Sequence, residues 1–287
     1  MTASKDVDAL IARADTLAIE EGHSPDAVRA CDAAVAAARA LIGQLESRDN
    51  RRRLGRALWR QATTAAAGGD GAAIAMARES VELTLSVLRE SSVNEPGFDD
   101  LIGECATHLA DLGLLFAVSG DRATADRLLR EAKVAAELSP GPAARLARAT
   151  AMRIAFKIAA QDAGDRARRR EQSAADTARL LRTGQDTVTL LWEVADDDRP
   201  TTLLDLADGL RDLGFAHIIA ARHQPAANAL AEAYGIYSCF DGPTSKRAVD
   251  TILTALNRLG TAPGVQVVVP MPGSWRLASR KNRPRHY

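Results

Sequence analysis

Cys105 and His108 are the residues of this chain whose types and spacing come closest to a metal site. They lie three apart in a stretch with helical periodicity, so both side chains would face one side of a helix. Zinc in proteins takes three or four ligands, and no other Cys or His clusters near this pair in the sequence. We therefore expect a buried cysteine with a partly exposed histidine, and we assign no metal and no cofactor to the chain.

Other titratable residues give no stronger indication of catalysis. His217 and His223 flank an expected helix end, where turn and packing roles are common. The acidic run of Glu193 with residues 196–198 lacks the glycine and the terminal glutamate of a calcium-binding loop. The glycine-rich segment 68–71 has no following Lys-Ser/Thr and no preceding strand, which argues against a phosphate-binding loop. We assign no catalytic residue.

Two arginine-rich segments leave an anion-binding role open. They are Arg51–Arg53 with Arg56 and Arg60, and Arg166 with Arg168–Arg170. Both are expected to begin helices, where positive charge opposes the helix dipole. Either neighbouring acids compensate and these are solvated faces, or the arginines form an anion or nucleic-acid patch.

The bulk composition limits the classes of function. The chain has 287 residues, no net charge and 46% hydrophobic residues, enough for one elongated array or two compact domains. Overall charge gives no case for nucleic-acid binding, although residues 263–287 carry five basic residues and no acid. The three cysteines are scattered, which favours a reduced intracellular protein. No stretch resembles a signal peptide and no apolar run reaches about 18 residues, so we expect a cytoplasmic protein without membrane contact.

Apolar residues recur at steps of three and four, which is typical of amphipathic helices. They predict five helical hairpins, 7–20 with 25–45, 52–67 with 71–89, 100–118 with 121–138, 143–160 with 165–181, and 187–221 with 224–240. A helix over 244–259 would cap the array. The acidic run near 196 and Pro200 leave open that 187–221 holds two helices, the second starting at Thr201 or Thr202.

A spacing of small residues recurs at the expected turns. A glycine is followed by an alanine five residues later and a small residue seven beyond that. The sets are Gly22/Ala27/Ala34, Gly68/Ala73/Ser80 and Gly120/Ala125/Ala132, with Ala221/Ala226/Ala233 as a copy lacking the glycine. Glycine suits a tight turn, and small side chains allow two helix backbones to approach closely.

At the third hairpin this pattern resembles a tetratricopeptide repeat. The residues that carry the resemblance are Leu112-Gly113, Phe116, Gly120, Ala125, Leu129 and Ala132, and again Leu213-Gly214, Ala226, Leu230 and Ala233, with His217 in place of the aromatic residue. The turns at Gly22, Gly68, Gly120, Gly164 and Ala221 lie 46, 52, 44 and 57 residues apart, whereas the family period is about 34. Such lengthened repeats are similar to those of bacterial sensor and regulatory proteins. The resemblance implies an all-α, right-handed superhelical solenoid over residues 1–262, followed by a basic tail over 263–287 that is disordered or docked.

In tetratricopeptide-repeat proteins, inward-facing residues of each first helix line a concave groove. The resemblance therefore implies a partner-binding groove formed by Ala110, Leu114, Ala117, Ile154, Ile158, Gln161, Arg211, Phe215 and Ile218. This set is mostly apolar, with Arg211 as one polar anchor, and lacks the lysine and asparagines of a carboxylate clamp. We expect a non-enzymatic interaction module for a peptide, an amphipathic helix or a protein surface. The alternatives are a regulatory or nucleic-acid-associated protein that uses the arginine-rich segments and the tail, and an enzyme on a helical scaffold.

Overall fold

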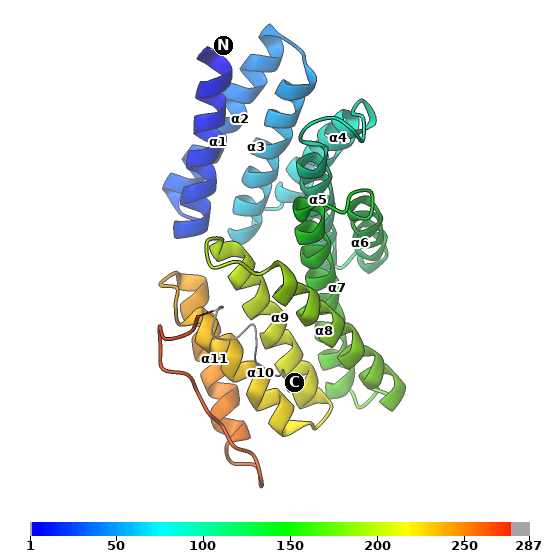
Figure 1. The fold of residues 1–287 in the computed structure, drawn as a ribbon, viewed down its shortest axis with the longest axis vertical. Helices are drawn as coiled ribbons and strands as arrows, with labels where there is room; N and C mark the ends of the chain where they lie inside the picture. Colours follow the sequence, from blue (N-terminus) through cyan, green and yellow to red (C-terminus); the bar gives the residue numbers. More distant parts are fainter. Residues whose placement is uncertain (1, 277–287) are drawn as a thin grey trace. The chain divides into compact units, whose positions relative to one another are not determined.

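The structure, a computed structural model, describes residues 2–276, and all regular secondary structure within them is helical. Eleven helices follow one another along this part of the chain (Figure 1). They are α1 Thr2–Glu21, α2 Pro25–Gln44, α3 Arg48–Ala67, α4 Ala73–Arg89, α5 Phe98–Val118, α6 Arg122–Ala136, α7 Pro142–Arg168, α8 Ala174–Val194, α9 Pro200–Ile219, α10 His223–Tyr237 and α11 Pro243–Leu259. The all-α prediction is confirmed.

Helices that follow each other in the sequence also pack against each other. The chain divides into two compact units, Met1–Ala151 and Met152–Tyr287. In the first unit α1 pairs with α2, α3 with α4 and α5 with α6, while α2 also contacts α3 and α4 contacts α5. In the second unit α9 pairs with α10, and α8 and α11 pack against them. This sequential packing agrees with the predicted array of helical hairpins.

The recurring small residues lie where paired helices meet. A Cβ built on Gly113 would lie 3.3 Å from the carbonyl oxygen of Ala125, and one built on Gly214 would lie 3.4 Å from that of Ala226. Glycine on one helix therefore faces alanine on the other. The small residues of all four sets are buried, namely Ala27, Ala34, Ala73, Ser80, Ala125, Ala132, Ala226 and Ala233. The role that the spacing predicts for them is confirmed.

The turns show why glycine is used at most of these positions. Gly22 and Gly120 have φ of 66° and 95°, in the left-handed region that residues with a Cβ disfavour. In the second hairpin Gly69, rather than Gly68, takes this conformation, with φ of 78°. Ala221 adopts it without being glycine, at φ 54°. A Cβ in that region costs about 1–2 kcal/mol, so the fifth hairpin contains a strained turn.

The fourth hairpin differs from the prediction of helices at 143–160 and 165–181. Helix α7 continues through Gly164 to Arg168, because Gly164 does not adopt a positive φ and a helix tolerates one glycine. The turn is made instead by Arg170, at φ 59°. Helix α8 then begins after Ser173, whose side chain caps it by accepting from the Asp176 backbone N–H.

This shift corrects the placement of the second arginine-rich segment. Arg166 and Arg168 lie in the last turn of α7 and do not begin a helix. Positive charge at a helix C-terminus complements the dipole, so no bound anion is needed to explain them. The expected break between Val194 and Pro200 is confirmed, since α8 ends at Val194 and α9 begins at Pro200. The expected break between 181 and 187 is wrong, because residues 187–194 continue α8.

Helix α5 is the one helix of the described residues that is long and apolar enough to cross a membrane by length and composition. The helix contains no unbroken apolar run of that length, because charged residues such as Glu104 and Asp111 interrupt it. Of its apolar window, 67% is buried, and α5 packs against α3, α4 and α6. Buried core helices commonly share this composition, so the apolar character is explained by packing.

Candidate functional site

Residues 263–276, the part of the predicted tail that the structure describes, form an irregular segment beside the last helices of the second unit (Figure 1). Near its start, the Gln266 backbone N–H donates to Oε1 of Gln224 at 2.8 Å, and Nε2 of Gln224 donates to the Gln266 carbonyl at 3.0 Å. Farther along, the Gly273 N–H donates to the Ser238 hydroxyl at 3.3 Å. The segment is therefore tied to α10 and its C-terminal end.

Trp275 anchors this segment in the second unit. Its side chain is only 3% exposed, and its indole N–H donates to Oε1 of Glu232 at 2.6 Å. The ring lies against Trp192 of α8, with centroids 6.1 Å apart and planes tilted by 34°. Gly235 leaves the space, since a Cβ there would lie 2.9 Å from Cδ1 of Trp275. We call Trp192, Glu232 and Gly235 the Trp275 cradle.

A pocket of about 320 Å³ opens beside Trp275. It is lined by Asp197, Pro200, Leu203, Ile236, Cys239, Phe240, Trp275 and Arg276, five of which are apolar. Leu203 and Ile236 are buried, Phe240 is half-buried, and Asp197 and Arg276 are exposed. We call it the Phe240 pocket. Its volume is near the lower end of the range of about 300–1,000 Å³ for ligand pockets, which is enough for one or two side chains.

A network of charged side chains joins α7, α9 and α10 within the second unit. Arg211 contacts Asp208 at 2.8 Å and Asp212 at 2.9 Å, and it donates to the Tyr237 hydroxyl at 3.1 Å. Arg153 lies 3.0 Å from Asp205 and 3.4 Å from Asp208. The Tyr237 hydroxyl donates in turn to Asp208. Arg211, the predicted polar anchor for a partner, is thus held by side chains of its own chain.

The pKa values in this network reflect burial set against pairing. Burial disfavours ionised Asp208, but Arg153, Arg211 and the Tyr237 hydroxyl outweigh it and hold the pKa below its usual range. For Asp212 burial prevails over Arg211, so its pKa is raised. Burial, followed by the charge of Asp208, raises the pKa of Tyr237. Each of these carboxylates therefore contacts Arg211.

Oδ2 of Asp212 and both ring nitrogens of His217 are among the buried atoms of this unit that have no hydrogen-bond partner within the described residues. Burial, and then the charge of Arg222, lowers the pKa of His217 to about 4. A general base must come within hydrogen-bond distance of its substrate, and the His217 ring is only 3% exposed. His217 occupies a packing position, as the sequence suggested.

His108 in the first unit is buried, which corrects the expectation of a partly exposed ring. Its Nδ1 lies 3.1 Å from the hydroxyls of both Ser80 and Thr84. Ser80 donates its hydrogen to the Gly55 carbonyl and Thr84 donates to the Ser80 carbonyl, so Nδ1 must carry the proton that both hydroxyls accept. Trp59 stacks on the ring, with centroids 5.1 Å apart.

Cys105 is buried as expected, and burial followed by the charge of Glu104 raises the pKa of its thiol to about 12. Burial, then Arg56 and Arg60, lowers the pKa of His108 to about 3. The pair therefore holds a neutral thiol and a neutral imidazole. Within residues 2–276, no group of three or more His, Cys, Asp and Glu side chains is placed to hold a metal ion.

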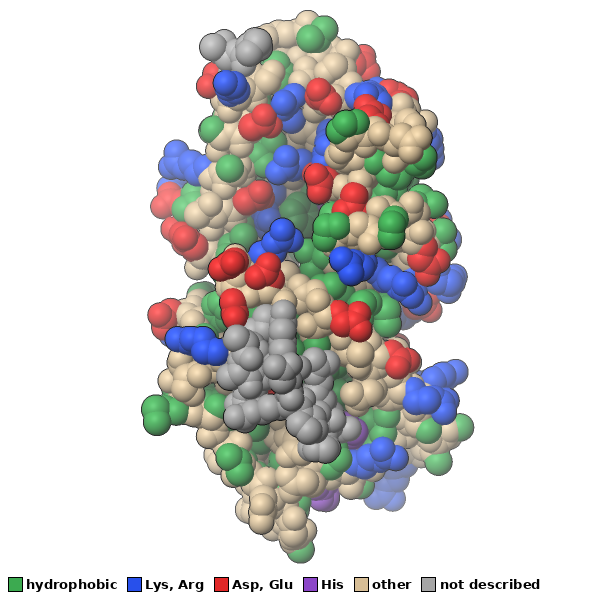
Figure 2. Space-filling view, in the orientation of Figure 1, with side chains coloured by type: hydrophobic (Ala, Val, Ile, Leu, Met, Phe, Trp, Pro, Cys, Tyr) green, Lys and Arg blue, Asp and Glu red, His purple; other side chains and the backbone are tan. Residues whose placement is uncertain are grey.

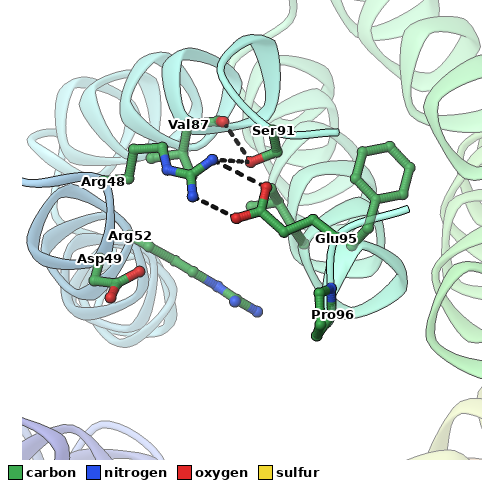
Figure 3. Close-up of a pocket in the computed structure, with 10 residues that line it drawn as sticks. Arg48, Asp49, Arg52, Val87, Ser91, Glu95 and Pro96 are labelled. Atoms are coloured by element: carbon green, nitrogen blue, oxygen red, sulfur yellow. Dashed lines mark hydrogen bonds and ion pairs between the residues drawn. The ribbon is translucent and has the colours of Figure 1, made fainter. Parts of the chain in front are cut away.

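The arginines of α3 pair with carboxylates on other elements of the first unit. Figure 3 shows Arg48 directed toward Glu95 and Ser91 across a pocket of about 70 Å³. The remaining pairs are Arg51 with Glu90, Arg52 and Arg56 with Glu104, Arg53 with Asp8, and Arg60 with Asp15. Positive and negative side chains accordingly adjoin one another on this unit (Figure 2). These pairs favour structural compensation over an anion patch.

The predicted groove residues do not share one environment. Ala110, Ala117, Ile154 and Ile158 are buried, Leu114, Arg211, Phe215 and Ile218 are half-buried, and Gln161 is exposed. The first helix of the third hairpin supplies Ala110, Leu114 and Ala117 in the first unit, and the other six lie in the second unit. The four buried side chains are already covered by the chain itself, whereas the Phe240 pocket opens at the surface.

The sequence does not indicate which residues pack around Trp275. Trp192 lies on the apolar face of α8, where its position predicts an ordinary core residue. Glu232 lies on α10, where its position predicts an ordinary surface carboxylate. The one available signal was composition, since the chain contains only three tryptophans. Comparison with protein-family models, with curated proteins and with solved structures finds no match to this chain.

Proposed function

We propose that this protein is a non-enzymatic interaction module that binds a peptide, an amphipathic helix or a protein surface. The observation that carries the proposal is the Phe240 pocket, an accessible and mostly apolar cavity in the second unit. An apolar side chain of a partner would enter it, since burying a Leu- or Phe-sized side chain contributes about 1.5–3 kcal/mol. Asp197 and Arg276 are exposed and of opposite charge, and they would orient polar groups of the partner.

We further infer that the hairpins form a right-handed superhelix of the tetratricopeptide type. The buried small residues at matching positions of the hairpins support this inference. In the first unit, first helices also contact one another, α1 with α3 and α3 with α5, as expected for stacked hairpins. A crystal structure of the full chain would test the hand and the regularity of the array.

Nucleic-acid binding has less support than protein binding. The arginines of α3 pair with carboxylates, so few of them are available to phosphates. The remaining basic residues of the tail, Arg280, Lys281, Arg283 and Arg285, lie outside the described residues. A steep fall of binding with rising salt would indicate phosphate contacts, whereas apolar binding depends little on salt.

A displayed library of random peptides tests the proposed function. The full chain should select peptides rich in apolar and aromatic residues, and Phe240→Ala should weaken the selected peptides about tenfold or more. Ile19→Ala is the matched control, because Ile19 is an apolar side chain, 50% exposed, in the first unit. The proposal fails if no peptide is selected, or if the folded Phe240→Ala protein binds as well as the wild type.

A further inference from the structure

The geometry of the tail points to a second role for the surface around Trp275. We infer that the Trp275 cradle is a recognition site for a partner segment that carries a tryptophan, and that residues 265–276 of the chain itself occupy this site as an internal ligand. The inference rests on the proposed function, because it names the chemistry of the partner that this region binds.

The cradle is specific for an indole ring. Glu232 accepts the indole N–H of Trp275 at 2.6 Å, while Trp192 packs against the ring. A phenylalanine offers no donor to this carboxylate, and a tyrosine carries its O–H at the far end of the ring. Tryptophan combines the largest apolar surface with a donor on the ring edge, so the partner's anchor should also be tryptophan.

Gly235 adds a second requirement for the bound segment. A Cβ at this position would lie 2.9 Å from Cδ1 of Trp275 and 3.1 Å from Cγ of Pro270. The tail therefore lies directly on the helix surface at both residues. A partner segment that fits the same place should present a proline or another compact residue a few positions before its tryptophan.

Between its anchors the tail has few interactions. Val268 and Met271 are 78% and 75% exposed, and the backbones of residues 267–269 make no hydrogen bond within the described part of the chain. The contacts that hold it include the Gln224–Gln266 pair, the bond from Gly273 to Ser238, and the Trp275 anchor. Pro270 also packs against α10 at Gly235, and the Cys239 thiol donates to the Trp275 carbonyl. A segment held at a few points can detach locally while the helices stay folded.

The Phe240 pocket explains how a partner could displace an attached tail. A tethered segment competes at an effective concentration on the order of millimolar. The tail brings Trp275 to the edge of the pocket but leaves about 320 Å³ of it open. A partner that places tryptophan in the cradle and a second apolar side chain in the pocket gains contacts that the tail does not make.

The test uses the full chain with Trp275→Ala, which vacates the cradle, and a fluorescent synthetic peptide of residues 265–276. By anisotropy, the variant should bind this peptide at least about tenfold more tightly than the wild type does, because the internal competitor is weakened. A peptide with alanine in place of its tryptophan should bind at least about tenfold more weakly to the variant. Circular dichroism and thermal melting establish that the variant is folded.

Three results would overturn the inference. In the first, the folded variant binds neither peptide, and in the second it binds both equally. In the third, the wild type forms a dimer that Trp275→Ala dissociates, which would make the tail of a second copy the occupant. If the variant does not fold, hydrogen exchange of residues 265–275 in the wild type replaces it. Exchange there should rise with excess peptide, and unchanged exchange with peptide bound would contradict the inference.

This experiment separates the inference from the proposed function. If the tail peptide does not bind Trp275→Ala but library peptides still bind the wild type through Phe240, the interaction module stands without the internal ligand. If neither binds, the proposed function fails as well.

Discussion

Gly113 of α5 lies so close to α6 that a Cβ built on it would be 3.3 Å from the carbonyl oxygen of Ala125. Both residues are buried. Neither can carry a larger side chain unless the two helices separate, so this contact sets the spacing of the third hairpin. The equivalent contact between Gly214 and Ala226 sets the spacing of the fifth.

Ala125→Leu should lower the free energy of unfolding by about 1–3 kcal/mol, because the added side chain overpacks this contact. Urea denaturation measures the change. Ala123 is exposed on the same helix, so Ala123→Leu should change stability by less than about 0.5 kcal/mol. Equal losses at the two sites would show that the small residues do not set the helix spacing.

Ala221→Gly should stabilise the protein by about 0.5–1 kcal/mol. Glycine relieves the cost of a Cβ at φ 54°, partly offset by its greater freedom in the unfolded chain. Gly120→Ala provides the reciprocal variant, at φ 95°, and should destabilise. Chemical denaturation measures the free energy of unfolding of both variants, and a loss of stability in Ala221→Gly would contradict the strained turn.

Gly235→Ala should release the tail while leaving α10 intact, because the new Cβ would meet Trp275 at 2.9 Å. Hydrogen exchange of residues 265–275 should rise, and tryptophan fluorescence should shift to the red. Gly43→Ala is the matched control, since a Cβ at this helical glycine meets nothing within 4 Å. Unchanged exchange in Gly235→Ala would mean that the tail does not depend on this contact.

Arg211→Met should cost about 3 kcal/mol or more at neutral pH, since it removes the cation that Asp212 contacts and one of the two that Asp208 contacts. The loss should shrink in acid, because protonated carboxyl groups need no cation. Arg29→Met is the control, as the Arg29 side chain is 71% exposed, and it should be nearly neutral. Denaturation at pH 7 and pH 4 gives both quantities, and equal losses at the two pH values would contradict the ionic role.

His108 should make the fold sensitive to acid. The unfolded chain binds a proton at this ring below the ordinary pKa of 6.5, whereas the folded protein does so only below a pKa of about 3. Acidification between these values therefore favours unfolding, by about 1.4 kcal/mol per pH unit. His108→Asn keeps an N–H donor for Ser80 and Thr84 without titrating, so the slope of unfolding free energy against pH should fall. An unchanged slope between pH 6 and pH 4 would contradict the role of His108 in this acid sensitivity.

Helix periodicity and turn residues predicted the hairpin order well, because both depend on local sequence. The fourth hairpin was misplaced because Gly164 looks like a turn residue, while the left-handed position is taken by Arg170, which no propensity rule would select. The alignment of α7 with α8 in this hairpin depends on side-chain packing, including the contact of Phe156 on α7 with Gly184 on α8.

The site was harder to predict than the fold. Trp275 and Glu232 meet across 43 residues of sequence, and nothing local marks the glutamate as its acceptor. The predicted groove followed the geometry of a regular repeat, yet Ile154 and Ile158 are buried in this lengthened array. Periodicity identifies the faces of a helix, but only the packing of neighbouring helices decides which face remains open.

The long separation between Trp275 and its cradle also has a consequence for biosynthesis. Chains grow at about 5–20 residues per second, so the 43 residues from Glu232 to Trp275 take roughly 2–9 seconds to add. Trp192 is made earlier still, whereas Gly235 follows Glu232 by three residues. All residues of the cradle are therefore made before Trp275, and the segment that covers them is the last of the described residues to be added.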